Sequence, residues 1–368
     1  MEWKKVNICD MCDSISATYS RGADMVVLIN TSDVLDGKFL NRERVPNKDL
    51  KGQFKKTFQR DDILYSEIRP ANKRFAYVDF DAIDYIASTK LMVLRAKPNV
   101  NPRFLYHILK SESILEQLQV LAESRSGTFP QITYSEMANV SVLLPDYATQ
   151  DKIVAILSSL DDKIENNNRI NRNLETQAQA LFKSWFVDFE PFGGKMPEDW
   201  KEGTLGEIAH VTSGKRPPLK QSLCSADINI PLIGAADIMG YTNSVLYTTP
   251  ILVTGRVGTH GIVQRFNEPC WPSDNTLVVE GKWYEYIYQT MCRIDYHNMN
   301  RGSTQPLITQ TDLKNQKVII PNVLILDKFE TQVTILYKQV YINQRENDRL
   351  AALRDTLLPK LMKGEIEV

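Results

Sequence analysis

The sequence predicts an α+β protein built from two copies of one unit, each made of a globule followed by a long helix. The first observation is an internal repeat, because residues 126–186 reappear without a gap as residues 302–362. The second is a pair of heptad patterns that close the two halves of the chain. The third is a series of short apolar runs separated by Gly, Asp and Asn. We therefore expect two globules related by a pseudo-two-fold axis and separated by two long antiparallel helices that form a coiled coil.

Each predicted globule contains short strands and one clear helix. In the first half the strands are expected at residues 25–29, 63–65, 75–78 and 91–94, with a helix around residues 102–121. In the second half they are expected at residues 230–233, 251–253, 262–263 and 277–279, with a helix from residue 283 onward. Most loops between these runs differ between the halves. A repeated scaffold with divergent loops suggests one task performed on two different targets.

The two long helices share an apolar seam that two Asn residues interrupt in each copy. In the first helix the seam positions are Ile153, Leu157, Leu160, Ile164, Asn167, Asn171, Leu174, Ala178, Leu181 and Trp185. In the second they are Phe329, Val333, Leu336, Val340, Asn343, Asn347, Leu350, Arg354, Leu357 and Leu361. A helix of about 40 residues is about 60 Å long, and its strict heptad period requires a partner helix. The simplest partner is the other copy.

The paired Asn residues suggest how the two helices align. In an antiparallel pair Asn167 would face Asn347, and Asn171 would face Asn343. A buried Asn costs stability but penalises every register in which it meets hydrocarbon, so these four residues are our candidates for fixing the register. A parallel pair would also match Asn to Asn, and the Asn could instead face solvent. The long segment between the helices favours the antiparallel arrangement, which allows the globules to lie at opposite ends.

The chain is long enough for two domains with cores of their own, at 368 residues. Helix-start and helix-stop signals at Pro145, Pro191 and Pro321 divide it into five segments. These are a first globule at residues 1–145, a helix at 146–190, a linker at 191–197, a second globule at 198–321 and a helix at 322–368.

Composition excludes several classes of protein. No apolar run approaches the roughly 20 residues that span a bilayer, and the start of the chain does not resemble a signal peptide, so we expect a cytoplasmic protein without a membrane segment. Five scattered Cys suit a reducing compartment. Cys9 and Cys12 have the spacing of half a zinc site, but no second pair completes it, so no metal is expected.

Three stretches carry a resemblance to a known family. A Gly/Ser-Thr-x-Pro-x-Ile-Thr run precedes each helix at residues 127–133 and 303–309, and residues 181–186 read Leu-Phe-Lys-Ser-Trp-Phe. Residues 353–366 read Leu-Arg-Asp-Thr-Leu-Leu-Pro-Lys-Leu-Met-Lys-Gly-Glu-Ile. On these motifs the whole chain resembles the specificity subunits of type I restriction-modification enzymes.

The resemblance implies a function and a set of partners. Each globule would be a target recognition domain that reads one half of a split sequence in double-stranded DNA. The helices would act as a ruler and would dock two methyltransferase subunits and, through them, restriction-translocase subunits. The chain itself would be non-catalytic and would need no cofactor.

Within this interpretation, Lys and Arg contact phosphates and polar loop residues read bases. In the first globule our candidates are Lys38, Arg42, Arg44, Lys55, Lys56, Arg60, Arg69, Lys73, Arg74, Arg125, Ser126 and Thr128. In the second they are Lys215, Arg216, Lys220, Arg256, His260, Arg265, Arg301, Thr304 and Gln305. For each cation, a solvated surface charge is the competing interpretation.

The usual catalytic motifs are missing from the sequence. It contains no Asn-Pro-Pro-aromatic motif for amino methylation, and the segment Thr212 to Lys215 lacks the upstream Gly of a phosphate loop. The alternative to a DNA-recognition subunit is a coiled-coil scaffold whose globules bind proteins. Steep salt dependence of DNA binding would separate the two, since neutralised phosphates release counterions.

Overall fold

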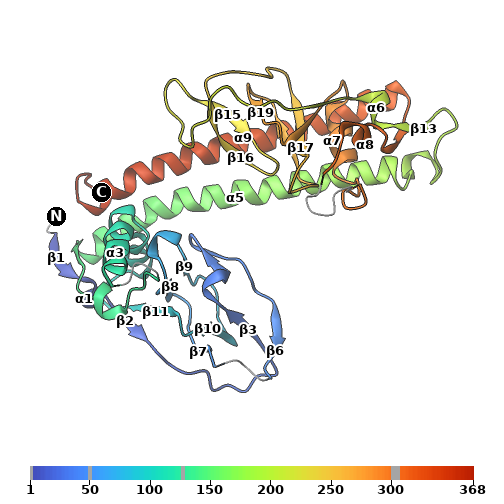
Figure 1. Ribbon diagram of the computed structural model, residues 1–368. Helices are drawn as coiled ribbons and strands as arrows, with labels where there is room; N and C mark the ends of the chain where they lie inside the picture. Colours follow the sequence, from blue (N-terminus) through green and yellow to red (C-terminus); the bar gives the residue numbers. More distant parts are fainter. Residues whose placement is uncertain (1–2, 49–51, 126–128, 300–306) are drawn as a thin grey trace. The chain divides into compact units, whose positions relative to one another are not determined.

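The computed structural model describes residues 3–48, 52–125, 129–299 and 307–368, and the chain divides into two compact units. Unit 1 comprises residues 1–166 and 346–368, and unit 2 comprises residues 167–345. Both units combine helices with small sheets, so the α+β prediction is confirmed (Figure 1).

The main sheet of unit 1 has four antiparallel strands in the order β2-β11-β8-β9. They are β2 (Cys12–Ile15), β11 (Leu91–Ala96), β8 (Ile63–Ser66) and β9 (Phe75–Tyr77). All four residues of β8 are buried, as are the first four of β11, because helices cover one face and a second sheet covers the other. The three apolar runs that predicted β8, β9 and β11 are therefore the centre of the core.

Unit 2 repeats this sheet in the order β14-β20-β17-β18, again fully antiparallel. Its strands are β14 (His210–Ser213), β20 (Thr276–Glu280), β17 (Ile251–Gly255) and β18 (Val263–Phe266). A two-stranded sheet accompanies each copy, β1 (Lys4–Asn7) with β12 (Ser141–Leu144) and β13 (Lys201–Thr204) with β21 (Lys317–Ile320). The internal repeat is thus a repeat of topology.

The second sheet is where the two units diverge. In unit 1 its order is β6 (Arg44–Pro46), β3 (Met25–Ile29), β10 (Tyr85–Ser88) and β7 (Phe54–Lys56). In unit 2 it is β16 (Ile238–Thr242), β15 (Ile230–Ile233) and β19 (Trp271–Pro272). Each has a central strand, β3 or β15, with one parallel neighbour, β10 or β19, and one antiparallel neighbour, β6 or β16. Among the described residues, the fourth strand β7 has no counterpart in unit 2.

Short helices complete each unit. In unit 1 they are α1 (Ile8–Met11), α2 (Pro102–Leu109), α3 (Glu112–Arg125) and α4 (Tyr134–Met137), and in unit 2 they are α6 (Leu205–Ile208), α7 (Tyr284–Met291) and α8 (Gln310–Lys314). The single helix predicted around residues 102–121 was wrong, because α2 and α3 are separate. Ser111 lies at the break, where its carbonyl accepts the first hydrogen bonds of α3 from the N–H groups of Ile114 and Leu115.

The long helices are α5 (Tyr147–Phe186) and α9 (Val323–Met362), with 40 residues each. In unit 1, Asp161 of α5 accepts a hydrogen bond from Arg354 of α9 at 2.8 Å, and Lys163 pairs with Glu346 at 3.2 Å. In unit 2, the rings of Phe182 and Phe329 lie 5.9 Å apart. In unit 2 Asn171 also contacts Asn343, so in both units later residues of α5 contact earlier residues of α9. The helices therefore run antiparallel, as predicted.

The seam between the helices is buried or half-buried along its length, and three of its four Asn residues are buried. Asn171 and Asn343 are 6% and 5% exposed, and the amide Nδ2 of Asn343 donates to Oδ1 of Asn171 at 2.8 Å. The predicted contact between these two residues is confirmed, and the alternative that they face solvent is wrong. Asn167 is 1% exposed. Its pairing with Asn347, and the control of register by all four Asn, remain predictions.

Candidate nucleic-acid interface

The described end of the repeated run, residues 129–133 and 307–309, is held against the end of strand β8 in unit 1 and of strand β17 in unit 2. Ile132 and Ile308 are fully buried, and their backbone N–H groups donate to the carbonyls of Glu67 at 2.8 Å and Arg256 at 3.0 Å. In unit 1 the N–H of Arg69 also donates to the carbonyl of Pro130 at 3.1 Å. The backbones of Arg69 and Arg256 therefore lie beside the described part of the run, a contact that the sequence did not predict.

The final Thr of each run caps a short helix. The Thr133 N–H donates to the carboxylate of Glu136 at 2.8 Å, and the Thr309 N–H donates to the carboxylate of Asp312 at 3.0 Å. Both are capping boxes, and the Thr-x-x-Glu and Thr-x-x-Asp patterns could have been recognised in the sequence. The Ile and the final Thr thus have a structural role. Outside the described residues lie Ser126, Thr128, Arg301, Thr304, Gln305 and the side chain of Arg125.

One group of predicted cations in unit 1 surrounds the hairpin of β4 (Val34–Leu35) and β5 (Lys38–Phe39). Lys38 is exposed on β5, and Arg74 donates to the carbonyls of Ser32 and Val34 at 3.1 and 3.3 Å. Lys73 forms an ion pair with Glu112 at 2.5 Å. The structure therefore brings Lys38, Lys73 and Arg74 together, although internal contacts already hold Lys73 and Arg74.

A second group lies around residues 79–81. The guanidinium of Arg42 stacks 4.4 Å from the ring centre of Phe80, and Arg60 pairs with Asp81 at 3.1 Å. Both cations are exposed. Two further exposed candidates, Arg44 on β6 and Lys55 on β7, occupy opposite edge strands of the second sheet and are not brought together.

Lys56 does not fit the prediction. Its ammonium group donates to the carbonyls of Thr89 at 3.0 Å and Leu91 at 2.8 Å, and burial lowers its pKa. A cation that satisfies two backbone carbonyls inside unit 1 is a structural residue. We therefore remove Lys56 from the candidate DNA contacts.

The clearest cluster of unit 2 is the segment between β14 and β15 that carries Lys215, Arg216 and Lys220. The Lys215 N–H donates to the carbonyl of Pro272 at 3.0 Å, while the indole of Trp271 donates to the Lys215 carbonyl at 2.8 Å. The segment is thus fixed to the second sheet, and all three cationic side chains remain exposed. This arrangement can present positive charge to a phosphate backbone.

Two further candidates of unit 2, Arg256 and His260, lie around the turn that follows β17. Both side chains are half-buried. His260 places Nδ1 3.2 Å from the carbonyl oxygen of Gly255, while its buried Nε2 has no hydrogen-bond partner among the described residues. These two residues therefore stay in the candidate set, beside the buried Ile of the repeated run.

Arg265 on β18 is a structural residue, contrary to the prediction. It donates twice to Glu285, at 2.5 and 2.7 Å, and its side chain is 16% exposed. Its guanidinium also stacks on the ring of Tyr337 at 3.7 Å. A cation that is buried in an ion pair cannot reach a phosphate, so Arg265 is removed from the candidate contacts.

A cluster of metal-ligating side chains and a membrane-spanning helix are both missing from the described residues. Among them, no three His, Cys, Asp or Glu side chains come together as metal ligands would. None of the described helices is both long and apolar enough to cross a membrane. The exposed cations lie on loops and edge strands, where they can bind a polyanion but are not arranged for covalent chemistry.

Comparison with known proteins identifies the family. Residues 1–176 and 197–345 match the family model of the type I restriction modification DNA specificity domain. The type I restriction enzyme HindI specificity subunit of Haemophilus influenzae is 31% identical, over 99% of this chain and 100% of that protein. The MjaIX specificity subunit of Methanocaldococcus jannaschii is 28% identical over 74% of this chain and 71% of its own length.

A solved structure shares the fold. The crystal structure of the type I restriction-modification system S subunit from M. genitalium matches with a TM-score of 0.60 and 18% identity, over 98% of this chain and 96% of that one. The chain therefore belongs to the family of type I restriction-modification DNA specificity domains, and its function is to recognise DNA within such a system.

Proposed function

We propose that each unit reads one half of a bipartite target in double-stranded DNA, and that the chain does this in the cytoplasm without catalytic activity of its own. The observation that carries the proposal is the repeated main sheet, whose strand order is the same in both units, beside a second sheet that differs. A shared scaffold with different neighbouring loops suits two readers with different sequence preferences. We assign the readers to residues 1–145 and 198–321, with 191–197 as linker.

Phosphate contacts would come from the exposed cations. In unit 1 these are Lys38, Arg42, Arg44, Lys55, Arg60 and Arg69, and in unit 2 they are Lys215, Arg216 and Lys220, with Arg256 and His260 beside them. Such contacts orient the protein on the duplex, and base discrimination would come from the loops of the second sheet.

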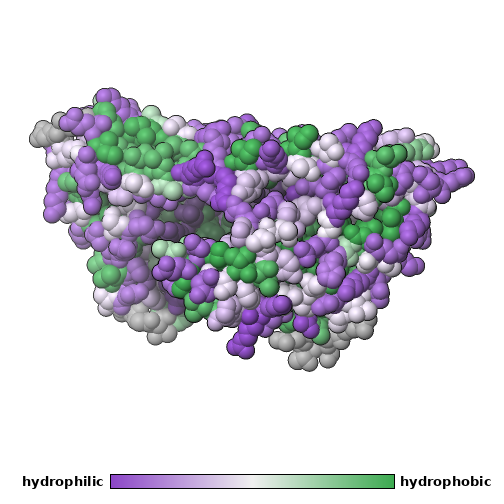
Figure 2. Space-filling model, turned by 90° about the horizontal axis from the view of Figure 1, so that it is seen from above, coloured by the Kyte–Doolittle hydropathy of each residue, from purple (hydrophilic) through white to green (hydrophobic). Residues whose placement is uncertain are grey.

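The helix segments 146–190 and 322–368 would set the spacing of the two half-sites and dock two methyltransferase subunits, with restriction subunits binding through them. On α9, Leu324, Ile335 and Ile342 are 81%, 65% and 48% exposed. Figure 2 shows apolar side chains gathered in several groups on one face, with polar residues between them. Exposed apolar groups on a long helix favour a protein partner.

Exchange of residues 1–145 for the matching segment of a relative tests the assignment. The exchange should replace one half of the methylated motif and leave the other half unchanged, because each reader would act on its own half-site. Single-molecule sequencing of methylated host DNA reads both halves at once. A new sequence in both halves would contradict two independent readers.

The phosphate contacts are tested by replacing three cations of unit 2 with Ala, namely Lys215, Arg216 and Lys220. The slope of log affinity against log salt should decrease by about 0.9 for each phosphate that the variant no longer neutralises, so by roughly 2 to 3. Replacement of the exposed Lys195 and Lys338 is the control and should leave the slope unchanged. Salt-independent DNA binding by the unaltered complex would favour a protein-binding scaffold instead.

A further inference from the structure

In unit 2 the first turn of α7 is capped by a residue of another helix. The N-cap residue Trp283 makes no capping hydrogen bond with its side chain to the residues that the structure describes. Instead, the carboxylate of Glu330 on α9 accepts hydrogen bonds from the N–H of Glu285 at 2.9 and 3.1 Å and from the N–H of Tyr286 at 3.4 Å. A carboxylate at a helix N-terminus satisfies free N–H groups and interacts favourably with the helix dipole.

A second carboxylate of α9 holds the residues just before α7. Asp327 accepts a hydrogen bond from the indole Nε1 of Trp283 at 2.7 Å and pairs with Lys282 at 3.0 Å. Because Asp327 and Glu330 are three positions apart, they lie on one face of α9. Together they form a clamp, which we name the α9 clamp, on the N-terminus of α7.

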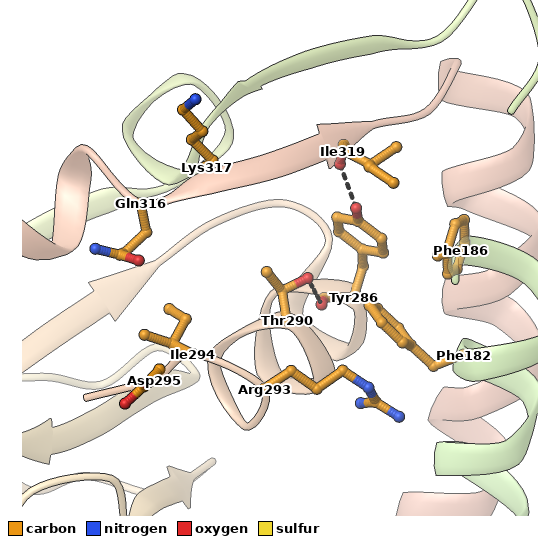
Figure 3. A pocket seen from close by; sticks show the side chains of 10 residues that line it. All are labelled: Phe182, Phe186, Tyr286, Thr290, Arg293, Ile294, Asp295, Gln316, Lys317 and Ile319. Atoms are coloured by element: carbon orange, nitrogen blue, oxygen red, sulfur yellow. Dashed lines mark hydrogen bonds between the residues drawn. The ribbon is translucent and has the colours of Figure 1, made fainter. Parts of the chain in front are cut away.

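On the side shown in Figure 3, α7 packs against α5 through aromatic rings. The ring of Tyr286 lies 5.5 Å from that of Phe182 and 4.9 Å from that of Phe186, both on α5, and its hydroxyl donates to the carbonyl of Ile319. Beside these residues a hollow of about 240 Å³ extends along Thr290 to the residues that follow α7. The buried side chains of α7 therefore pack it against its neighbours, and the α9 clamp adds directional hydrogen bonds at its N-terminus.

Unit 1 holds α2 in a related way, through the first turn of α5. Asn101 caps α2 by accepting from the N–H of Arg103 at 2.9 Å. The N–H of Asn101 donates to the side-chain oxygen of Gln150 at 2.8 Å, and its Nδ2 donates to Asp151 at 2.8 Å. Gln150 and Asp151 form the α5 clamp. Asp151 and Asp327 occupy matching positions of the internal repeat.

We infer that the α5 clamp and the α9 clamp are positioning residues that fix each DNA reader at one angle on its long helix, and thereby fix the number of base pairs between the half-sites. This inference rests on the proposed function. Successive base pairs are rotated by about one tenth of a turn, since B-DNA has about 10 base pairs per turn. A reader whose angular freedom is much smaller than this rotation accepts one spacing. A reader with greater freedom also accepts the neighbouring spacings.

The test replaces both residues of the α9 clamp with Ala, as D327A/E330A, in the complete system expressed in cells. Plasmids would carry the wild-type motif with its own spacer, or with a spacer about one base pair shorter or longer. We expect methylation of the altered spacers, relative to the natural one, to rise about tenfold, while the bases read in each half stay the same. A tenfold change in relative occupancy corresponds to about 1.4 kcal/mol.

The controls separate positioning from folding. The single replacement E330A should relax the spacer preference, whereas E330Q, which retains an acceptor oxygen, should keep the wild-type preference. D348A removes an exposed carboxylate of α9 and should leave the spacer preference unchanged. If D327A/E330A is not recovered as a folded protein, Q150A of the α5 clamp makes the same test in unit 1.

Four results are decisive. A folded clamp variant with the wild-type spacer preference, or with altered bases in a half-site, would overturn the positioning role. The absence of a bipartite motif in the wild type would instead refute the proposed function. A relaxed spacer that E330Q fails to restore would assign the effect to weakened packing and not to the hydrogen bonds.

Discussion

The buried pair of Asn171 and Asn343 makes a prediction that a double-mutant cycle can measure. Replacing either residue by Leu removes the 2.8 Å hydrogen bond and leaves the other amide in a seam where both residues are at most 6% exposed. A buried polar group without its partner costs about 1 to 3 kcal/mol. Gln339, which donates to Asn343 at 2.8 Å, is exposed and can turn to water.

The double replacement N171L/N343L should therefore be more stable than the two single replacements predict. No unpaired amide remains in it, and each Leu adds apolar burial, so we expect a coupling free energy of about 1 to 3 kcal/mol. The variant should also self-associate more readily, because only Asn167 and Asn347 then remain in the seam to penalise other registers.

Urea unfolding followed by Trp fluorescence measures this coupling free energy, because most Trp residues lie in the same unit as the Asn pair. Of the five Trp residues, Trp185, Trp200, Trp271 and Trp283 belong to unit 2, which also contains the Asn pair. Q177L, at an exposed position of α5, is the control for adding a Leu. Single effects that add to within about 0.5 kcal/mol, with unchanged sedimentation, would refute a role of this pair in register.

Three further replacements test single contacts. Burial would raise the pKa of Asp161, but Lys110 and Arg354 outweigh it, so the pKa is lowered. The ionised carboxylate therefore stabilises the folded protein at neutral pH, and this stabilisation is lost as the pH falls through the folded pKa. D161N should cost roughly 1 kcal/mol at neutral pH and reduce the acid sensitivity of thermal unfolding. Burial raises the pKa of Glu330 from 4.5 to about 7, so the stability of unit 2 should fall as the pH rises through that range, and E330Q should flatten the fall in urea unfolding. Gly37 has a φ of +85°, and a Cβ there would collide with the hydroxyl of Tyr106. G37A should therefore lower the free energy of unfolding by about 1 to 3 kcal/mol. An unchanged midpoint of thermal unfolding would contradict this close approach.

The sequence alone was sufficient for the elements that local pattern determines. The heptad seam predicted α5 and α9, because burial along a helix follows its period. The long segment between the helices predicted their antiparallel course, and with it the contact between Asn171 and Asn343. The second sheets were largely missed. Their edge strands are two to five residues long, and pairing with distant segments, rather than local propensity, stabilises them.

Candidate DNA contacts were harder to separate from structural charges. Arg265 and Lys220 look alike in the sequence, yet Arg265 is paired with Glu285 while Lys220 is exposed. The partners of Lys56 are backbone carbonyls, which every residue has, so the sequence does not identify this contact. Whether a cation reaches solvent depends on tertiary contacts. The sequence could therefore predict a set of candidate cations but not which of them are exposed.

The division of the chain into units has a consequence for the order of synthesis. Unit 2 is one continuous segment, whereas unit 1 needs residues 346–368, which leave the ribosome after all of unit 2. Leu358 and Leu361 from this segment pack into the core that contains Ile8 and Leu157. Chains generally fold as they emerge, so the globule made first must wait for residues made after the second before its core is complete. Premature termination after residue 345 would thus leave all of unit 2 in place but remove Leu358 and Leu361 from the apolar core of unit 1.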